Sequence, residues 1–307
     1  MKRLLTRGIP IAFYIGIAVF LFLYLRTIDF GVFRELSPDW RFLGLALTHG
    51  MAFRYLGAFI WIVILRGLGA GEARYSRELV YVYAKSWLGR YIPGTAPWIL
   101  GKIYFASQHG VSKTKLGVSS LLEAGTQIIV LLIASSLMLV VDPRLETVGT
   151  GLRVAMVAII VIGVIALWPP LFNRLITVAY RWLKKGSLPR EHLATGPVVM
   201  KGVALYGVGA ILSGLSLFFV AKAVDPSLGY SDVLFVIGVG NLAGALGMLA
   251  VFTPSGLGVR EATQLALLSL IMPTEFALVV TVTTRLWGII TDLIFFSVST
   301  LAVRRPG

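Results

Sequence analysis

The order of apolar and polar residues along the chain predicts a protein built from membrane-spanning helices. Six apolar runs are bounded by charged or turn-forming residues. A helix of each length would cross the hydrocarbon core of a bilayer, which is about 30 Å thick. The six runs are residues 9–25, 42–65, 116–141, 154–171, 202–224 and 275–303. We therefore predict an all-α polytopic integral membrane protein in which residues 1–307 form a single transmembrane domain.

Two further apolar stretches are interrupted in the middle, and each predicts a broken, re-entrant helical hairpin. The first begins near Tyr75 and breaks at RYIPG, residues 90–94. The second joins residues 233–252 to residues 262–271 through TPSGLGVRE. Proline lacks a backbone N–H and disfavours a helical residue before it, whereas glycine adopts conformations that are closed to other residues. Non-helical backbone at membrane depth is tolerated only where protein or a water-filled cavity satisfies its polar groups.

The same order of elements occurs twice along the chain. Two spans, a broken hairpin and a long helix fill residues 9–141, and the same series fills residues 154–303. Because each half crosses the membrane three times, the second copy is expected to be inverted, with both hairpins meeting near the midplane. An alternative count treats the two arms of the second hairpin as separate crossings and gives eight spans.

Composition supports a membrane protein and excludes several kinds of site. The mean hydropathy is +0.85, and 57% of residues are hydrophobic while 14% are charged. The chain has no cysteine, which excludes disulfides and thiolate chemistry. Its three histidines, His49, His109 and His192, are scattered singly and predict no metal site. No phosphate-binding GxxxxGK[ST] loop is present, and we predict no cofactor.

The distribution of positive charge predicts the orientation of the chain. Sixteen of the 28 Lys and Arg residues fall in the termini and loops that this topology places on one side. The positive-inside rule puts that side, with both termini, in the cytoplasm. The net charge of +14 then suits anionic lipid headgroups, and no nucleic-acid motif competes with that partner. The basic segment at residues 172–201 is expected to be either a helix lying in the interface or an ordinary cytoplasmic loop.

Charged residues within the apolar stretches carry the functional argument. A lone cation at the centre of a helix costs roughly 2.5–3.5 kcal/mol on insertion scales. The cations are Arg54, Lys85, Arg90, Lys102, Arg260 and Arg285, and the acids that can offset part of this cost are Glu123, Glu261 and Asp292. Gln127 lies one turn after Glu123, on the same helix face.

These cations allow two interpretations. In the structural one, Arg54 and Arg285 pair with Glu123 and Asp292, while Lys85 and Lys102 extend toward an interface. In the functional one, Arg90 and Arg260 lie beside helix breaks, where half-helices present free N–H groups and partial positive charge. A guanidinium added to such a helix end makes a cradle for phosphate. We therefore expect an anionic substrate.

The broken motifs resemble a known family. The stretch LGRYIPGTAPWILGKIYFASQHGVSKTKLGVSSLLE, the later FTPSGLGVREATQLALL and the helix with TTRLWGIITDL are similar to the lysylphosphatidylglycerol synthase transmembrane, or flippase-like, family. The resemblance implies a prokaryotic cytoplasmic membrane and translocation of a lipid headgroup. It places around the path Arg90, Pro93, Gly94, Lys102, Glu123, Pro254, Gly256, Gly258, Arg260, Glu261 and Arg285. We expect Tyr91 and Asp292 to bind the substrate as well. The chain departs from the family pattern at Lys102, where arginine is usual, and at Ser255, where glycine is usual.

Three functions follow from these observations. The first is translocation of an anionic phospholipid or a polyprenyl-phosphate-linked lipid through a polar groove between the repeats. The second is an intramembrane enzyme in which Glu123, Glu261 or Asp292 acts as general base. The third is a non-catalytic partner of a lipid-modifying enzyme. Because only two residues follow Arg305, we expect no aminoacyl-transfer domain and no enzymatic activity.

Overall fold

The computed structural model describes residues 38–71, 73, 75–92, 96–146, 149–184, 193–251 and 253–304, with five separate positions at 15, 19, 22, 23 and 26. Helices hold most of these described residues, and none of them forms a strand. This confirms the prediction of an all-α polytopic membrane protein. The predicted first span, residues 9–25, lies outside the described residues apart from the separate positions.

Long helices form the body of the molecule. Within the described ranges, five helical segments are long and apolar enough to cross a membrane. They are α2 (Trp40–Gly67), α5 (Lys113–Val140), α8 (Gly196–Val224), the segment Tyr230–Leu249 that contains η5 (Tyr230–Asp232) and α9 (Val233–Leu249), and α11 (Thr274–Arg304). Four of these correspond to predicted spans or long helices, and α9 is the first arm of the second hairpin.

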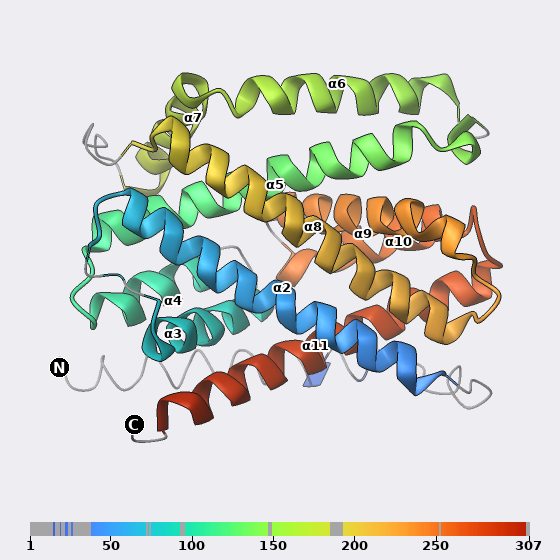
Figure 1. Cartoon of the computed structure of the whole chain (residues 1–307), viewed down its shortest axis with the longest axis horizontal. Coiled ribbons are helices and arrows are strands. Elements are labelled where there is room, and N and C mark those ends of the chain that lie inside the picture. The colour runs from blue at the N-terminus through green and yellow to red at the C-terminus, as the bar shows by residue number, and fades with distance from the viewer. Residues whose placement is uncertain are drawn as a thin grey trace.

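Helices α2 and α8 run alongside each other through the middle of the bundle (Figure 1). Asp39 caps α2 by accepting a hydrogen bond from Arg41 N at 2.8 Å. The Ser216 hydroxyl of α8 donates to the Ala46 carbonyl of α2 at 2.8 Å. No hydrophobic force drives helices together within a membrane. Small residues and interhelical hydrogen bonds, such as the one from Ser216 to Ala46, hold them close instead.

The predicted span at residues 154–171 is wrong at its C-terminal end. Helix α6 (Thr150–Ala166) stops early, and α7 (Pro169–Lys184) continues at 89° to it. Pro169 and Pro170 cause the turn, because a proline ring inside a helix clashes with the preceding turn, whereas proline is favoured at a helix start.

Helix α7 is amphipathic and shows that the first half of the basic segment is helical rather than a loop. Phe172, Ile176 and Tyr180 are buried along one face against α5 and its neighbours. Arg174 and Arg181 are exposed. This pattern suits a helix lying at the membrane interface, and that location stays a prediction. Residues 185–192 of the segment lie outside the described residues.

Both predicted helix breaks are present, with arms of similar length in the first (11 and 12 residues) and of unequal length in the second (17 and 10 residues). The first consists of α3 (Arg77–Trp87), η2 (Leu88–Tyr91) and α4 (Ala96–Ser107), and the second of α9, η6 (Pro254–Gly256) and α10 (Val259–Leu268). The ten residues of α10 span about 15 Å at the helical rise of 1.5 Å per residue. That is half of the hydrocarbon core, so α10 is too short to be the separate crossing that the eight-span count requires.

The two halves pack against each other through equivalent elements. Helix α5, which follows the first hairpin, packs on α9 of the second hairpin. Helix α11, which follows the second hairpin, packs on α3 of the first. An exchange of this kind is what a two-fold relation between the repeats would produce, and the inverted orientation of the repeats stays a prediction.

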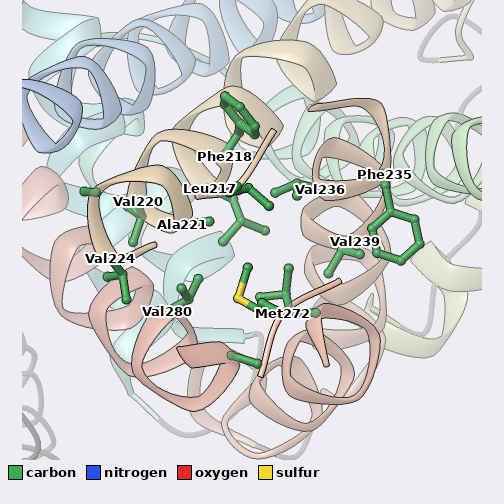
Figure 2. Packing of buried hydrophobic residues seen from close by; sticks show 14 of the residues in the cluster. Leu217, Phe218, Val220, Ala221, Val224, Phe235, Val236, Val239, Met272 and Val280 are labelled. Atoms are coloured by element: carbon green, nitrogen blue, oxygen red, sulfur yellow. The ribbon is translucent and has the colours of Figure 1, made fainter. Parts of the chain in front are cut away.

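An apolar core fixes the second hairpin in place. Figure 2 shows Leu217 of α8 next to Val236 of α9, and Val220, Val239, Met272 and Val280 belong to the same buried cluster. All of these side chains are buried. Helices α8 and α9 lie close together at Gly214, since a Cβ on this residue would lie 2.5 Å from an Ile237 side-chain carbon. The position of the second helix break is therefore set by rigid packing on one side.

Candidate functional site

The two helix breaks meet inside the bundle. Arg90 Nε of η2 donates a hydrogen bond to Ser255 Oγ of η6 at 2.9 Å. Arg285 Nη1 of α11 donates to the Ser255 carbonyl at 3.1 Å. This contact confirms the prediction that the two breaks converge. One residue of the second break thus receives hydrogen bonds from a cation of each half.

Local backbone geometry explains the residue types at the second break. Ser255 has φ 51° and ψ 30°, in the left-handed region. A non-glycine residue is uncommon there, which agrees with glycine being usual at this position in the family. Gly256 follows at φ 70°, and a Cβ on it would lie 2.5 Å from Gly247 Cα of α9. Only glycine allows this backbone contact, which holds the break against α9.

Four arginines from four elements surround the junction. Arg54 comes from α2, Arg90 from η2, Arg260 from α10 and Arg285 from α11. All four line a small pocket of about 30 Å³, together with Tyr91, Ser255 and Asp292. A space of that size is comparable to the volume of one water molecule. The junction is therefore a compact, strongly cationic site.

Asp292 of α11 is the buried acid of this cluster. Its side chain is 1% exposed and accepts three hydrogen bonds, from Arg54 Nε at 2.8 Å, Trp87 Nε1 at 3.1 Å and Tyr91 OH at 2.6 Å. The expected pairing of Arg54 with an acid is confirmed. Because both carboxylate oxygens are engaged, Asp292 fixes α2, α3 and η2 against α11.

Charges in the cluster do not balance. Against four arginines stand Asp292 and Glu261, whose Oε1 lies 3.3 Å from Arg285 Nη1. Glu261 Oε2 also accepts a hydrogen bond from Gly258 N at 2.7 Å and so caps α10. Two positive charges remain without a neutralising acid. Among the described residues, Arg260 has no hydrogen-bond or ion-pair partner, and Arg90 has only Ser255 and its stacking on Trp87, 4.7 Å from the ring centroid.

A larger cavity of about 310 Å³ opens beside the cluster. Arg54, Arg90 and Arg260 line it, and so does Gln127 of α5. Much of the remaining wall is apolar or aromatic. This wall includes Phe53, Trp87, Trp98, Ile128, Leu131, Leu217, Val220 and Met248. The cavity therefore offers a cationic end and an apolar wall to the same occupant.

Lys102 and Glu123 were expected in the binding path, but they form a closed pair beside it. Both residues are 0% exposed, and the Lys102 ammonium donates directly to the Glu123 carboxylate. Tyr83 OH donates to the other carboxylate oxygen at 3.1 Å. The Lys102 Nζ lies 3.9 Å from the centroid of the Trp98 ring. Neither residue lines the cavity. The expected pairing of Glu123 with Arg54 or Arg285 is wrong, because Lys102 occupies it.

The remaining expected residues divide into lining and supporting positions. Tyr91 and Gly256 line the site. Pro254 belongs to η6, and Gly258, at φ 84°, directly precedes α10. The Lys85 Nζ lies 3.9 Å from the Phe105 ring centroid, away from the cavity. Pro93 and Gly94 lie outside the described residues.

Several lining residues were not singled out from the sequence as site residues. Ser255 was noted only as a departure from the family, although it joins the breaks. Gln264 follows Arg260 by four residues, so helical spacing put it on the same face. Trp87 and Trp98 flank the first break, where an aromatic residue with a ring N–H suits a polar and apolar boundary. Asn241 and Ser213 carried no local signal, since they meet only through the packing of α8 on α9.

Within the described ranges, no group of three His, Asp or Glu side chains is placed to hold a metal ion. The site offers guanidinium, indole, phenol and amide donors. These groups bind oxygen acceptors.

Comparison with known proteins agrees with this architecture. No curated protein matches the chain. The family described as lysylphosphatidylglycerol synthase TM region matches residues 9–295, which is most of the chain. The chain therefore belongs to the lysylphosphatidylglycerol synthase transmembrane family and is a multi-pass membrane protein of lipid-related character.

Proposed function

We propose that this protein moves lipids with a phosphate-bearing headgroup across the membrane. The observation that carries the proposal is that Arg90 and Arg260, one from each helix break, face a single cavity and lack neutralising acids. The headgroup would pass through the cavity while its acyl or prenyl tails stay along the apolar wall. The setting we propose is the cytoplasmic membrane of a prokaryote, with both termini in the cytoplasm.

The energetics of buried charge support an anionic occupant. Two uncompensated guanidinium groups at membrane depth cost on the order of 5–7 kcal/mol on insertion scales. A phosphate that accepts charge-assisted hydrogen bonds from both would offset much of this cost. Each such bond contributes roughly 1.5–3 kcal/mol. An empty cluster is thus electrostatically unfavourable, and a bound phosphate relieves it.

The shape of the cavity supports a lipid rather than a free anion. Its volume of about 310 Å³ lies at the lower end of the range for small-molecule sites, roughly 300–1,000 Å³. Its wall carries Phe53, Ile128, Leu131 and Met248. A site for inorganic phosphate alone would have no use for this apolar surface, whereas a lipid presents both kinds of group.

An enzymatic function is less well supported, because each candidate base already has hydrogen-bond or ion-pair partners within the protein. Asp292 accepts three hydrogen bonds, Glu123 is bound by Lys102 and Tyr83, and Glu261 caps α10 and contacts Arg285. A general base needs a lone pair within reach of the substrate proton. The membrane-bound chain is therefore better suited to positioning a headgroup than to changing it.

Transport in reconstituted vesicles tests this proposal. Vesicles of phosphatidylcholine would contain the purified protein and acyl-labelled phosphatidylglycerol, and dithionite would bleach the outer leaflet. Arg90→Ala and Arg260→Ala should each slow transport about 10- to 100-fold, because each loses roughly 1.5–3 kcal/mol of phosphate contact. Arg174→Ala, an exposed arginine on α7, is the matched control and should transport like the parent.

The proposal fails if both cluster variants fold correctly and move the label as fast as the parent. Product formation by the purified protein would instead favour an enzyme. Co-purification with a lipid-modifying enzyme, without transport by the protein alone, would favour a non-catalytic partner.

A further inference from the structure

The larger cavity has a second chemical character beyond its cationic end. Among its described lining residues, the only charged side chains are Arg54, Arg90 and Arg260. None of the Asp, Glu, Lys and His residues that the structure describes lines it. A ligand ammonium group would therefore find no carboxylate in the cavity and would lie near three guanidinium groups.

Neutral polar side chains from four helices line the rest of the same cavity. They include Gln127 of α5, Ser213 of α8, Asn241 of α9 and Gln264 of α10. Ser213 and Asn241 already have partners, because the Ser213 hydroxyl donates to Asn241 Oδ1 at 3.1 Å and Asn241 Nδ2 donates to the Ala210 carbonyl at 3.1 Å. Their arrangement is fixed without a ligand.

Some of the other donors have no partner within the described part of the chain. Gln264 is 2% exposed, and its Nε2 makes no hydrogen bond. Trp287, which also lines the cavity, has a buried Nε1 without a hydrogen bond. Gln127 of α5, which is 5% exposed, also lines the cavity. Buried donors without acceptors are rare in folded proteins, and each one costs free energy until a partner arrives.

We infer that this neutral part of the cavity is a subsite for the oxygen-rich portion of the headgroup. The inference rests on the proposed function and names the class of lipid: a phosphate-bearing headgroup with hydroxyl, ester or sugar oxygens and no ammonium. Hydroxyl and ester oxygens accept hydrogen bonds from the unpartnered amide and indole N–H groups. An amine would bring further positive charge to a cavity that Arg54, Arg90 and Arg260 already line.

The subsite should discriminate strongly between headgroups with hydroxyl, ester or sugar oxygens and headgroups with an ammonium group. A site built around buried hydrogen-bonding groups rejects a ligand that leaves them unpaired far more strongly than an apolar pocket rejects a change of size. Burial of a charge without a partner is costlier still. The unpaired donors and the excess of guanidinium groups therefore act in the same direction.

A panel of lipids with identical labelled acyl chains tests this inference with the unmodified protein. Phosphatidylglycerol and phosphatidylinositol carry a phosphate and hydroxyl groups, whereas phosphatidylethanolamine carries a phosphate and an amine. In phosphatidylcholine vesicles, the two hydroxyl-bearing probes should cross at least about 10-fold faster than the amine-bearing probe, as expected for a hydrogen-bonding site. Equal rates, or a faster amine-bearing probe, would overturn the inference and leave the proposed function standing. Failure to move any of the probes would remove the proposed function and this inference together.

Variants connect the selectivity to the named residues. Gln264→Leu should reduce the ratio of phosphatidylglycerol to phosphatidylethanolamine transport about 3- to 10-fold, within the range measured for a single hydrogen bond. Arg260→Ala should slow both probes alike. Gln108→Leu, on the exposed turn after α4, is the matched control and should keep the parental ratio. If Gln264→Leu slows both probes equally, Gln264 supports the fold rather than the subsite, and its assignment is overturned.

Discussion

The two broken hairpins use the same device in opposite polarity. In the first half, Lys102 of the hairpin pairs with Glu123 of the long helix that follows. In the second half, Glu261 of the hairpin pairs with Arg285 of the long helix that follows. Each ion pair ties the returning arm of a broken hairpin to the next helix. The pairs thus occupy corresponding places, although their charges are exchanged.

Their surroundings differ, and the difference separates structure from binding. Lys102 and Glu123 are sealed among Trp61, Tyr83 and Trp98, with side chains 1% and 0% exposed. Glu261 is 22% exposed, and its partner belongs to a cluster with more cations than acids. The buried ion pair neutralises its own charges and stabilises the fold. The arginine cluster beside the cavity has more cations than acids, so it can still bind an anionic ligand. The comparison therefore predicts opposite effects of removing a cation at the two places.

The largest expected effect is at the sealed pair. Lys102→Met should destabilise the protein by about 3–5 kcal/mol, because it leaves the Glu123 carboxylate buried without its counter-charge. The double variant Lys102→Met with Glu123→Gln should recover most of this loss. Unfolding in mixed detergent micelles, followed by tryptophan fluorescence, measures both. A double variant no more stable than the single one would show that the pair is not a closed unit.

The next largest loss of stability is expected at the second helix break, where the backbones of Gly256 and Gly247 are in contact. Gly256→Ala should cost about 3 kcal/mol or more, since its Cβ would meet the Gly247 backbone and its φ is positive. Gly258→Ala is a matched comparison: φ is also positive, but a Cβ there meets nothing within 4 Å. It should cost about 1 kcal/mol. Equal losses in the same unfolding assay would mean that contact between the break and α9 is not what holds the site.

Removing a cation from the open cluster should have the opposite sign to removing Lys102. Arg260→Met takes away a guanidinium that has no described partner, so it should raise the free energy of unfolding by about 1–3 kcal/mol while slowing transport. Arg54→Met is the contrasting change, because it strips a partner from Asp292 and should lower stability. Loss of stability in Arg260→Met would indicate that this arginine is structural.

Much of the helical fold follows from the sequence, because apolar runs of bilayer length leave few alternatives to helices. The breaks were also visible, since Pro93, Pro254 and the neighbouring glycines interrupt those runs. The end of α6 was missed because the apolar pattern continues through Pro169 and Pro170 into α7, and only the prolines marked the bend.

Charge pairing at the site could be predicted only in part. Arg54 with Asp292 was expected, but the partner of Glu123 depends on how α4 rotates toward α5, which residue spacing does not reveal. The role of Ser255 could likewise be predicted only in part from the sequence. Its departure from glycine was visible, whereas its bond to Arg90 requires the two breaks to be placed in space. The excess of cations was readable from the sequence, and its distribution between a closed pair and an open cavity was not.

A substitution in a third charge cluster, at the edge of the bundle, should have the smallest effect on the free energy of unfolding. Arg144 donates to Asp142 and Asp232 at 2.6–2.7 Å and joins the loop after α5 to the start of α9. The Arg144 guanidinium lowers the pKa of Asp142 below its ordinary value. A carboxylate with a lowered pKa stabilises the fold above its unfolded pKa of about 3.9, and this contribution is lost as pH falls through the folded pKa.

Asp142→Asn should therefore cost at most about 1 kcal/mol near neutral pH, as is usual for partly exposed ion pairs. The difference from the parent should disappear when unfolding is measured well below pH 3.9. A difference that is independent of pH would contradict an ionic contribution from Asp142.

The most direct test of the central claim is a cryo-electron microscopy map of the protein in nanodiscs that contain phosphatidylglycerol. If the headgroup binds to both arginines, we expect ordered headgroup density in the cavity, with phosphate oxygens about 2.7–2.9 Å from the guanidinium nitrogens of Arg90 and Arg260. Headgroups confined to the outer surface of the bundle, with the cluster neutralised by its own acids and the cavity closed, would contradict it.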